Sequence, residues 1–360
     1  MKKTILTATA LSLILFTGFT FAAKSEFDRI IEDTKYYSEE DQKKLFDNYV
    51  RRGSKNIKTL AMIGYLYYNG IGTPVDKNVA LNMYKRSAEL GDSNGMYLLG
   101  KYLIEENNDI EGGLTELVKA SDKDNYQASE YIGHLYEDGK YVEKNNYYSL
   151  EYYHKSANAG SANSRLILAK KILDSGEEKN YKKGIDFLVA SADLNNTEAC
   201  LTLAKLYITE NQFLSVDPQK HIQYLMCAAD SGDKESIKTL AEYYAKGTIV
   251  MVDNDLSARY YGAYFGKRMG SPKNLEEANT YFDAGVAYYT TKKVKQAIDY
   301  FKAAAKAGHG EAAVSLGRIY ENGYGVKVDY KEASNYYKMA QKNGIDTSES
   351  VLRVESLKTR

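Results

Sequence analysis

Cysteine and histidine are scarce in this sequence of 360 residues, which contains two cysteines, four histidines and no tryptophan. It has no His-x-x-x-His or Cys-x-x-Cys pair, so the ligand spacing of a zinc site is missing. We therefore predict that the chain binds no metal and no cofactor and has no catalytic residues. The functional prediction is accordingly a protein that is not an enzyme.

Net charge is also absent, because 48 acidic residues balance 48 basic ones. A surface that neutralises several phosphates needs clustered lysine and arginine. The short basic stretch from Lys292 to Lys295 falls on a predicted turn between helices, where we expect it to be solvated. Nucleic acid is therefore not expected as a partner.

Long apolar runs are missing except at the N-terminus, where an apolar segment from Thr4 to about Phe19 follows two lysines. With the small residues that come after it, this is the pattern of a secretory signal peptide covering residues 1–23. An uncleaved anchor is the alternative, although the run is shorter than the roughly 20 residues of a membrane span. No cysteine lies near the predicted cleavage site to take a lipid anchor. We expect an exported protein, periplasmic or peripherally associated with the outer membrane, with no transmembrane span after cleavage.

A repeat is the main feature that the sequence does contain. A small residue returns at intervals of 32 to 44 residues, each time inside a short apolar phrase. An apolar residue precedes it and a large one follows three positions later in most copies, which marks one face of an α-helix. An interval of this length is typical of one helix–turn–helix unit copied many times. The members of this first column are Gly64, Gly100, Gly133, Ala169, Ala204, Ala241, Gly285 and Gly317.

A second helix follows in each copy. Most copies place a large apolar group four residues, and a small one seven residues, after a second column of mostly small residues. That column runs Ala80, Gly113, Ser149, Gly184, His221, Ala258, Ala297 and Ala333. Aspartates before these helices and glycines after them mark N-caps and left-handed C-terminal caps. These are Asp76, Asp217 and Asp329, with Gly91, Gly160, Gly232, Gly308 and Gly344. We predict an all-α fold, a right-handed superhelical solenoid of about eight helix–turn–helix repeats.

Three phrases resemble the Sel1-like repeat, a relative of the tetratricopeptide repeat. They run from Leu60 to Gly91, from Gln127 to Gly160 and from Glu311 to Ala340. Copies two and four have shorter loops, and copy seven is more similar to a tetratricopeptide repeat. We divide the chain into a signal peptide (1–23), N-terminal capping helices (24–53), Sel1-like repeats one to six (54–266), a linker (267–274), repeats seven and eight (275–344) and a C-terminal cap or tail (345–360).

Some motifs in the repeats could be mistaken for sites. Gly70-Ile71-Gly72 and Gly323-Tyr324-Gly325 follow helices rather than strands and recur in register with the repeat. Turn geometry explains them, so we reject a phosphate-binding role. His221 occupies a position that is small in the other copies, and we expect it to pack between helices.

The two cysteines, Cys200 and Cys227, lie in the two helices of copy five. Antiparallel packing would bring them to a similar height, and an oxidising compartment would favour a disulfide. Two buried unpaired thiols are the alternative. We take the pair as a disulfide candidate.

Tyrosine is the compositional anomaly, with 34 residues and several doublets on predicted helices. Adjacent residues on a helix point about 100° apart, so one ring of a doublet can pack inward while the other faces outward. The simpler interpretation is that tyrosine fills aromatic packing positions of the repeat. In the other, outward rings bind a partner, since tyrosine is enriched at interface hot spots. The candidate partner-binding residues are Tyr68, Tyr244 and Tyr289, which we assign to equivalent positions.

Function follows from the repeat and from what the resemblance implies. Sel1-like proteins often organise complexes, and exported ones can support envelope integrity or host infection. We predict a non-enzymatic, secreted protein–protein interaction scaffold of the bacterial envelope. Its expected partner is a protein, either an envelope or an outer-membrane protein.

Two rival functions remain open. The first is a binder or hydrolase of cell-wall material, because some exported family members bind muropeptides or β-lactam-like ligands. The second is a structural adaptor of an outer-membrane or polysaccharide-export complex.

Overall fold

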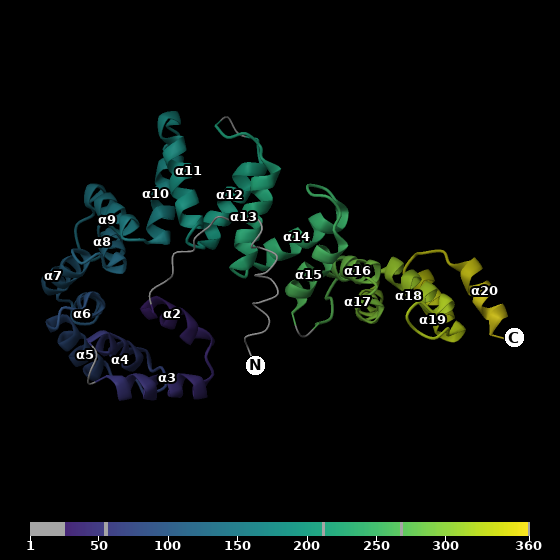
Figure 1. Ribbon diagram of the computed structural model, residues 1–360, viewed down its shortest axis with the longest axis horizontal. Helices are drawn as coiled ribbons and strands as arrows, with labels where there is room; N and C mark the ends of the chain where they lie inside the picture. The colour runs from purple at the N-terminus through teal and green to yellow at the C-terminus, as the bar shows by residue number, and fades with distance from the viewer. Residues whose placement is uncertain (1–25, 54–56, 211–212, 267–268, 359–360) are drawn as a thin grey trace. The chain divides into compact units, whose positions relative to one another are not determined.

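Helices make up the regular structure of the residues that the computed structural model describes, which are 26–53, 57–210, 213–266 and 269–358 (Figure 1). Eight helix pairs follow one another along the chain. They are α4 (Ile57–Asn69) with α5 (Lys77–Glu89), α6 (Ser93–Glu105) with α7 (Ile110–Ser121), α8 (Tyr126–Asp138) with α9 (Asn146–Asn158), α10 (Ala162–Asp174) with α11 (Glu178–Ala192), α12 (Thr197–Ile208) with α13 (Pro218–Asp230), α14 (Lys234–Lys246) with α15 (Asn254–Phe265), α16 (Leu275–Thr290) with α17 (Val294–Lys306), and α18 (Gly310–Asn322) with α19 (Tyr330–Lys342). The predicted all-α fold of about eight helix–turn–helix repeats is confirmed. None of these helices reaches the combination of length and hydropathy that crossing a bilayer requires, and the predicted signal peptide lies outside the described residues.

Further helices flank the eight pairs. Before them come α2 (Glu26–Asp33), the 3₁₀ turn η1 (Thr34–Tyr36) and α3 (Glu39–Arg52), and after them comes α20 (Ser348–Leu357). Ser38 caps α3 by accepting a hydrogen bond from the backbone N–H of Asp41. Phe46 of α3 meets Tyr67 of α4 edge to face, with ring centroids 5.1 Å apart. The predicted helix ahead of the first repeat is therefore present and packs on that repeat.

The chain divides into two compact units. Unit 1 runs to Leu203 and includes Asn211–Leu214, and its core contains apolar side chains of α2 to α8. Unit 2 comprises Ala204–Glu210 and Ser215–Arg360, and its core extends from α14 to α20. The predicted linker, 267–274, begins with two residues outside the described set and continues to α16.

The predicted helix ends are confirmed. The side chains of Asp76, Asp217 and Asp329 each accept hydrogen bonds from backbone N–H groups in the first turn of the following helix. All five predicted C-terminal glycines have positive φ, between 86° and 105°. Gly70 and Gly72 also have positive φ, 67° and 70°, and a Cβ on Gly72 would collide with the backbone of Gln42 in α3. The Gly-x-Gly phrase is thus a tight turn that lies against the preceding helix.

The small residues of the first column let the two helices of one repeat approach closely. A Cβ added to Gly133 would lie 2.8 Å from the ring of Tyr153, and one added to Gly317 would lie 2.6 Å from Tyr337. Both tyrosines come from the second helix of the same repeat and are fully buried. The ring of the second helix therefore occupies the space that a side chain of the first helix would fill.

The second column needs one correction, in copy six. Ser257, and not its neighbour Ala258, takes the column position, and its hydroxyl donates to the carbonyl of Ala241 in the first helix at 2.9 Å. The turn before it has the same length as in copy one, because the N-cap Asp253 bonds back to Tyr244. The assignment of Ala258 to the column is wrong by one residue. With the corrected register, Tyr261 takes the position that Tyr153 and Tyr337 hold elsewhere.

Consecutive repeats meet along seams of small side chains. The Ser156 and Ser164 hydroxyls, from α9 and α10, hydrogen-bond at 2.8 Å. The Ser121 and Ser129 hydroxyls do the same between α7 and α8, at 2.7 Å. At the seam between α5 and α6, Gly95 packs so closely against Ser87 that a Cβ would collide with it. Each of these seams therefore brings two helices together over side chains of at most two heavy atoms.

Candidate interaction surface and its polar network

Tyrosines from three successive first helices form one surface on unit 1, which we call the tyrosine face. Its residues are Tyr65 of α4, Tyr97 of α6, and Tyr126, Gln127 and Tyr131 of α8. Burial raises the pKa of Tyr97, with smaller effects from the carboxylates of Glu105 and Glu130 and from Tyr65. Phe27 and Asp28 of α2 contact Tyr65 and Gln127 directly, so these residues of α4 and α8 lie near one another. The face combines aromatic rings with hydroxyl and amide groups, which suits a partner that is both apolar and polar.

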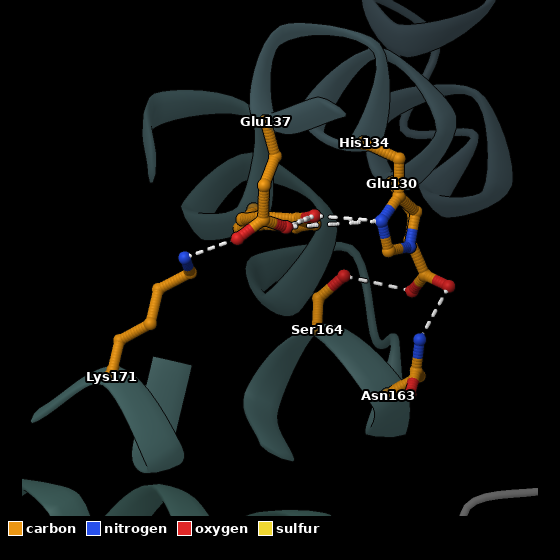
Figure 2. A network of polar contacts seen from close by, with 7 residues as sticks. Glu130, His134, Glu137, Asn163, Ser164 and Lys171 are labelled. Atoms are coloured by element: carbon orange, nitrogen blue, oxygen red, sulfur yellow. Dashed lines mark hydrogen bonds and ion pairs between the residues drawn. The ribbon is translucent and has the colours of Figure 1, made fainter. Parts of the chain in front are cut away.

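One edge of the tyrosine face is fixed by Glu130. Its carboxylate accepts hydrogen bonds from the hydroxyl groups of Ser161 and Ser164, at 2.5 and 2.8 Å. The side-chain amide of Asn163 donates to its other oxygen at 2.8 Å (Figure 2). All three donors stand at the start of α10, where Ser161 is the N-cap. A carboxylate is stabilised at a helix N-terminus, so this contact ties repeat three to repeat four.

A second group of contacts is centred on the hydroxyl of Tyr153, and Figure 2 labels its neighbours His134, Glu137 and Lys171. This hydroxyl donates to Glu137 Oε2 at 2.5 Å and lies 2.8 Å from His134 Nδ1. Lys171 of α10 donates to the other carboxylate oxygen of Glu137 at 2.5 Å. Burial alone would raise the pKa of Glu137, but the hydrogen bonds from Lys171 and Tyr153 lower it below its ordinary value. Burial and the Glu137 contact raise the pKa of Tyr153.

A closely similar arrangement recurs in unit 2. Tyr337 donates to Glu321 Oε2 at 2.6 Å, and Arg353 of α20 binds both oxygens of Glu321 at 2.6 and 3.0 Å. The hydrogen bond from Arg353 is the main reason that the pKa of Glu321 is lowered. Among the described residues, the hydrogen-bond partners of Glu321 here are Tyr337 and Arg353, so the arrangement forms without a histidine. We call it the Tyr–Glu latch: it joins both helices of one repeat to the next helix along the chain.

Copy six has the tyrosine of the latch but not its acceptor. The position of Glu137 and Glu321 is Ala245 in this copy. The hydroxyl of Tyr261 is buried and has no hydrogen-bond partner among the described residues. Burial raises its pKa. The same ring position is therefore satisfied in two copies and unsatisfied in a third.

The predicted partner-binding tyrosines are all half-buried rather than exposed. The hydroxyl of Tyr68 donates to Glu106 at 2.6 Å, and Lys77, which also bonds Glu106, lies 5.4 Å from its ring centroid. Burial raises the pKa of Tyr289. Tyr68 and Tyr289 occupy the same repeat position, four residues after the small residue.

Tyr244 does not share that position, so the predicted equivalence is wrong for this member. Its carbonyl oxygen accepts a hydrogen bond from the backbone of the N-cap Asp253 at 2.9 Å. Tyr67 accepts the same bond from Asp76 at 3.0 Å. Tyr244 is thus the counterpart of Tyr67, the ring that packs between the helices.

The exposed tyrosines lie at positions that the sequence-based interpretation did not select. Tyr147 and Tyr148 begin α9 and are 72% and 44% exposed. Tyr148 contacts Tyr136 at 5.2 Å between ring centroids, and Tyr136 stacks on Tyr152. The signal available in the sequence was the doublet directly before the small Ser149, since residues ahead of a buried position in the first turn face away from the partner helix.

The remaining candidates are structural. Cys200 and Cys227 are both disulfide-bonded, and with no other cysteine in the chain the bridge joins them to each other. His221 packs between helices as predicted, with Nδ1 2.7 Å from the carbonyl of Ala204 and Nε2 3.3 Å from the hydroxyl of Tyr243. Within the described residues, no group of three or more histidine, cysteine or acidic side chains could hold a metal ion.

One further motif of the sequence resembles a catalytic one. Residues 91–95 spell Gly-Asp-Ser-Asn-Gly, the Gly-x-Ser-x-Gly phrase of a hydrolase nucleophile elbow. That elbow requires a strand before the serine and a helix after it. Here helix α5 precedes the phrase, and Asp92 is simply the N-cap of α6. The phrase is a helix–helix turn.

Comparison with protein families identifies the repeats. The Sel1 repeat model matches residues 58–92, 127–161, 168–196, 240–263, 255–285, 281–309 and 310–344, more than half of the chain. A comparison with curated proteins finds no match. Similar solved structures include a protective antigen of uropathogenic Escherichia coli with an SLR fold, which is 23% identical over 86% of this chain, with a TM-score of 0.44. This chain spans 66% of the antigen chain, slightly less than two thirds.

Two other solved structures are of similar likeness. A Sel1 repeat protein from Oxalobacter formigenes is 24% identical over 57% of this chain and 86% of its own, with a TM-score of 0.47. An immunity protein from Pseudomonas aeruginosa is 20% identical over 58% of this chain and 84% of its own, with a TM-score of 0.41. With consecutive helix pairs, small seams and matching family models along most of its length, the chain belongs to the Sel1 repeat family.

Proposed function

We propose that this protein is an exported, non-enzymatic scaffold of the bacterial envelope, which binds an envelope or outer-membrane protein and supports envelope integrity or host infection. Membership of a repeat family that presents extended surfaces supports a scaffold role. The disulfide between Cys200 and Cys227 supports an oxidising compartment outside the cytoplasm, because disulfides are rare where thiols are kept reduced.

The tyrosine face is the single observation that carries the proposal. Tyr65, Tyr97 and Tyr131 come from three repeats and pack against one hydrophobic core, so a partner can contact several repeats at once. Tyr131 is held in place by its hydrogen bond to Glu105, 2.9 Å long, and by Lys101 at 5.6 Å from the ring centroid. Rings that are fixed before binding lose little conformational entropy when a partner arrives.

A photo-cross-linker at the tyrosine face tests the proposal in intact cells. We expect p-benzoylphenylalanine in place of Tyr131 to give an adduct with one envelope protein at fixed stoichiometry. The same group in place of Lys85, which is exposed on the second helix α5, is the matched control and should give no such adduct. Equal adducts from both positions, or none from either, would contradict the proposal.

The hydrolase rival is tested separately. Purified protein is incubated with muropeptides and with a chromogenic lactam, and we expect no product from either. Turnover that follows the protein through purification would contradict a non-enzymatic function.

A further inference from the structure

The tyrosine face already has an occupant, which is the protein's own helix α2. In Figure 1, α2 lies inside the curve that α3 to α9 describe, rather than stacked on the end of the first repeat. The side-chain amide of Gln127 donates to Asp28 Oδ1 at 2.7 Å, across 99 residues of sequence. Phe27 meets Tyr65 edge to face, with centroids 6.3 Å apart. One short helix thus reaches both the first and the third repeat.

The buried side of α2 is specific. Phe27 is 7% exposed and Asp28 is 9% exposed, although both belong to a helix of only eight residues. Burial raises the pKa of Tyr126, and the Asp28 carboxylate, which hydrogen-bonds it, raises it further. Arg29 and Asp33 on the other side of α2 are exposed. The contact therefore pairs an aromatic ring with a ring, and a carboxylate with an amide and a hydroxyl.

These contacts resemble the way a repeat surface holds a foreign helix, with an apolar anchor beside a charge-assisted hydrogen bond. The face presents hydroxyl and amide donors to Asp28, while α2 itself is acidic, with the sequence Glu-Phe-Asp-Arg-Ile-Ile-Glu-Asp. The recognised chemistry is thus a short amphipathic helix with an aromatic residue next to a carboxylate.

The structure of α2 and of its connection to α3 also allows α2 to dissociate from the tyrosine face. Isolated helices of eight residues are marginal in water, so α2 depends on the face for its order. A 3₁₀ turn and the extended residue Tyr37 separate it from α3, which begins after its own N-cap, Ser38. Release of α2 therefore breaks no hydrogen bond of the α3 cap. While attached, the short connection keeps α2 at a high effective concentration near the face.

We propose that α2 is a built-in ligand of the tyrosine face, and that the partner binds there through a short amphipathic helix, with an aromatic residue next to a carboxylate, that displaces α2. The proposal rests on the proposed function, since it assigns that function's partner chemistry and its regulation to the same face. Partner binding is then limited to the fraction of molecules in which α2 is released.

A labelled copy of α2 tests this exchange on the full chain. The probe is a fluorescent peptide of residues 26–33, with a hydrocarbon staple in place of Arg29 and Asp33, which face away from the surface. The chain is used as wild type and as Phe27→Ala/Asp28→Asn, in which α2 is loosened. If α2 covers the face about 90% of the time, the loosened chain binds the probe about tenfold more tightly. The variant Arg29→Ala alters only the exposed side and should bind as the wild type does.

Two controls locate the binding. Adding Gln127→Ala to the loosened chain should weaken probe binding, and a probe with alanine and asparagine in place of its phenylalanine and first aspartate should not bind. Hydrogen exchange of the wild-type chain should show faster exchange in α2 when the probe is present. Melting curves of the loosened chain within a few degrees of wild type show that the repeats remain folded.

Equal affinity for wild-type and loosened chains, or no binding to the loosened chain, would overturn the proposal. Neither result touches the proposed function, which depends on the cross-link from position 131. Conversely, the probe could bind the loosened chain tenfold more tightly while position 131 gives no cross-link. In that case α2 would be a ligand of the tyrosine face, but the proposal of an external partner would be refuted.

Discussion

For the Tyr–Glu latch we predict that the same substitution, Tyr→Phe, has opposite effects on stability at equivalent positions of different repeats. Tyr153→Phe and Tyr337→Phe remove a hydroxyl that donates to a carboxylate, whereas Tyr261→Phe removes a buried hydroxyl with no partner among the described residues. The ring stays in place in all three. We expect the first two changes to destabilise their repeats and the third to stabilise its repeat.

The magnitudes follow from what each change leaves behind. A hydrogen bond to a charged group contributes about 1.5–3 kcal/mol. Glu137 is still paired with Lys171, and Glu321 with Arg353, so neither carboxylate is left without a partner. We therefore expect the stability of the repeat to fall by about 1–2 kcal/mol in each case. An unsatisfied buried polar group costs about 1–3 kcal/mol, so Tyr261→Phe should gain about 1 kcal/mol.

Native-state hydrogen exchange is the suitable assay, because long repeat arrays do not unfold in one cooperative step. Opening free energies are read from peptides of α8 and α9 for Tyr153→Phe, and from α14 and α15 for Tyr261→Phe. A second variant supplies the missing acceptor: in an Ala245→Glu background, Tyr261→Phe should become destabilising.

The reasoning would be refuted if Tyr261→Phe destabilised its repeat as much as Tyr153→Phe destabilises its own. That result would mean that the Tyr261 hydroxyl is satisfied, or that the ring positions are not equivalent. Suppose that Tyr153→Phe and Tyr261→Phe behave as expected, but that Tyr261→Phe is still stabilising in the Ala245→Glu background. Position 245 would then not be the position of the acceptor.

Three further predictions concern stability. Gly133→Leu places side-chain atoms where a Cβ alone already lies 2.8 Å from a buried ring, so we expect a loss of roughly 1–3 kcal/mol or more, and a wild-type melting temperature would contradict this packing. Reduction of Cys200–Cys227, or replacement by serine, should lower the opening free energy of α12 and α13 in native-state hydrogen exchange by up to about 3.5 kcal/mol, and unchanged exchange would contradict this. The lowered pKa values of Glu137 and Glu321 contribute stability that is present above the ordinary pKa of 4.5 and lost as pH falls through the folded-state values, so melting temperatures from pH 7 to pH 3 should fall less steeply in the Glu137→Gln/Glu321→Gln double variant.

The repeat architecture could be predicted because close helix packing leaves a direct record in the sequence. Gly133 and Gly317 are small where the ring of the second helix needs space, and caps such as Asp76 bound the helices. The register of copy six was ambiguous, because Ser257 and Ala258 are both small. Only the N-cap Asp253, at the same distance from the first helix as in copy one, distinguishes them.

The surface could not be predicted to the same degree, because its contacts join distant parts of the chain. Nothing local to α2 indicates that Asp28 meets Gln127, and the capping assignment of residues 24–53 placed no partner opposite Phe27. The latch was equally hidden. Glu137 and Tyr153 are visible in the sequence, but a hydrogen bond between them depends on how far apart two helices stand.

The seams of serine, alanine and glycine bear on how such a chain can change over generations. Ser156 meets Ser164 across a boundary where neither side chain has a shape that the other must match. A gene segment encoding one repeat could be duplicated or lost at such a seam, because its small side chains place few constraints of shape on a new neighbour. Side chains that must fit a particular shape, such as Tyr153, pack inside one repeat and would be duplicated together with it. The number of repeats is therefore easier to change by mutation than the packing inside one repeat.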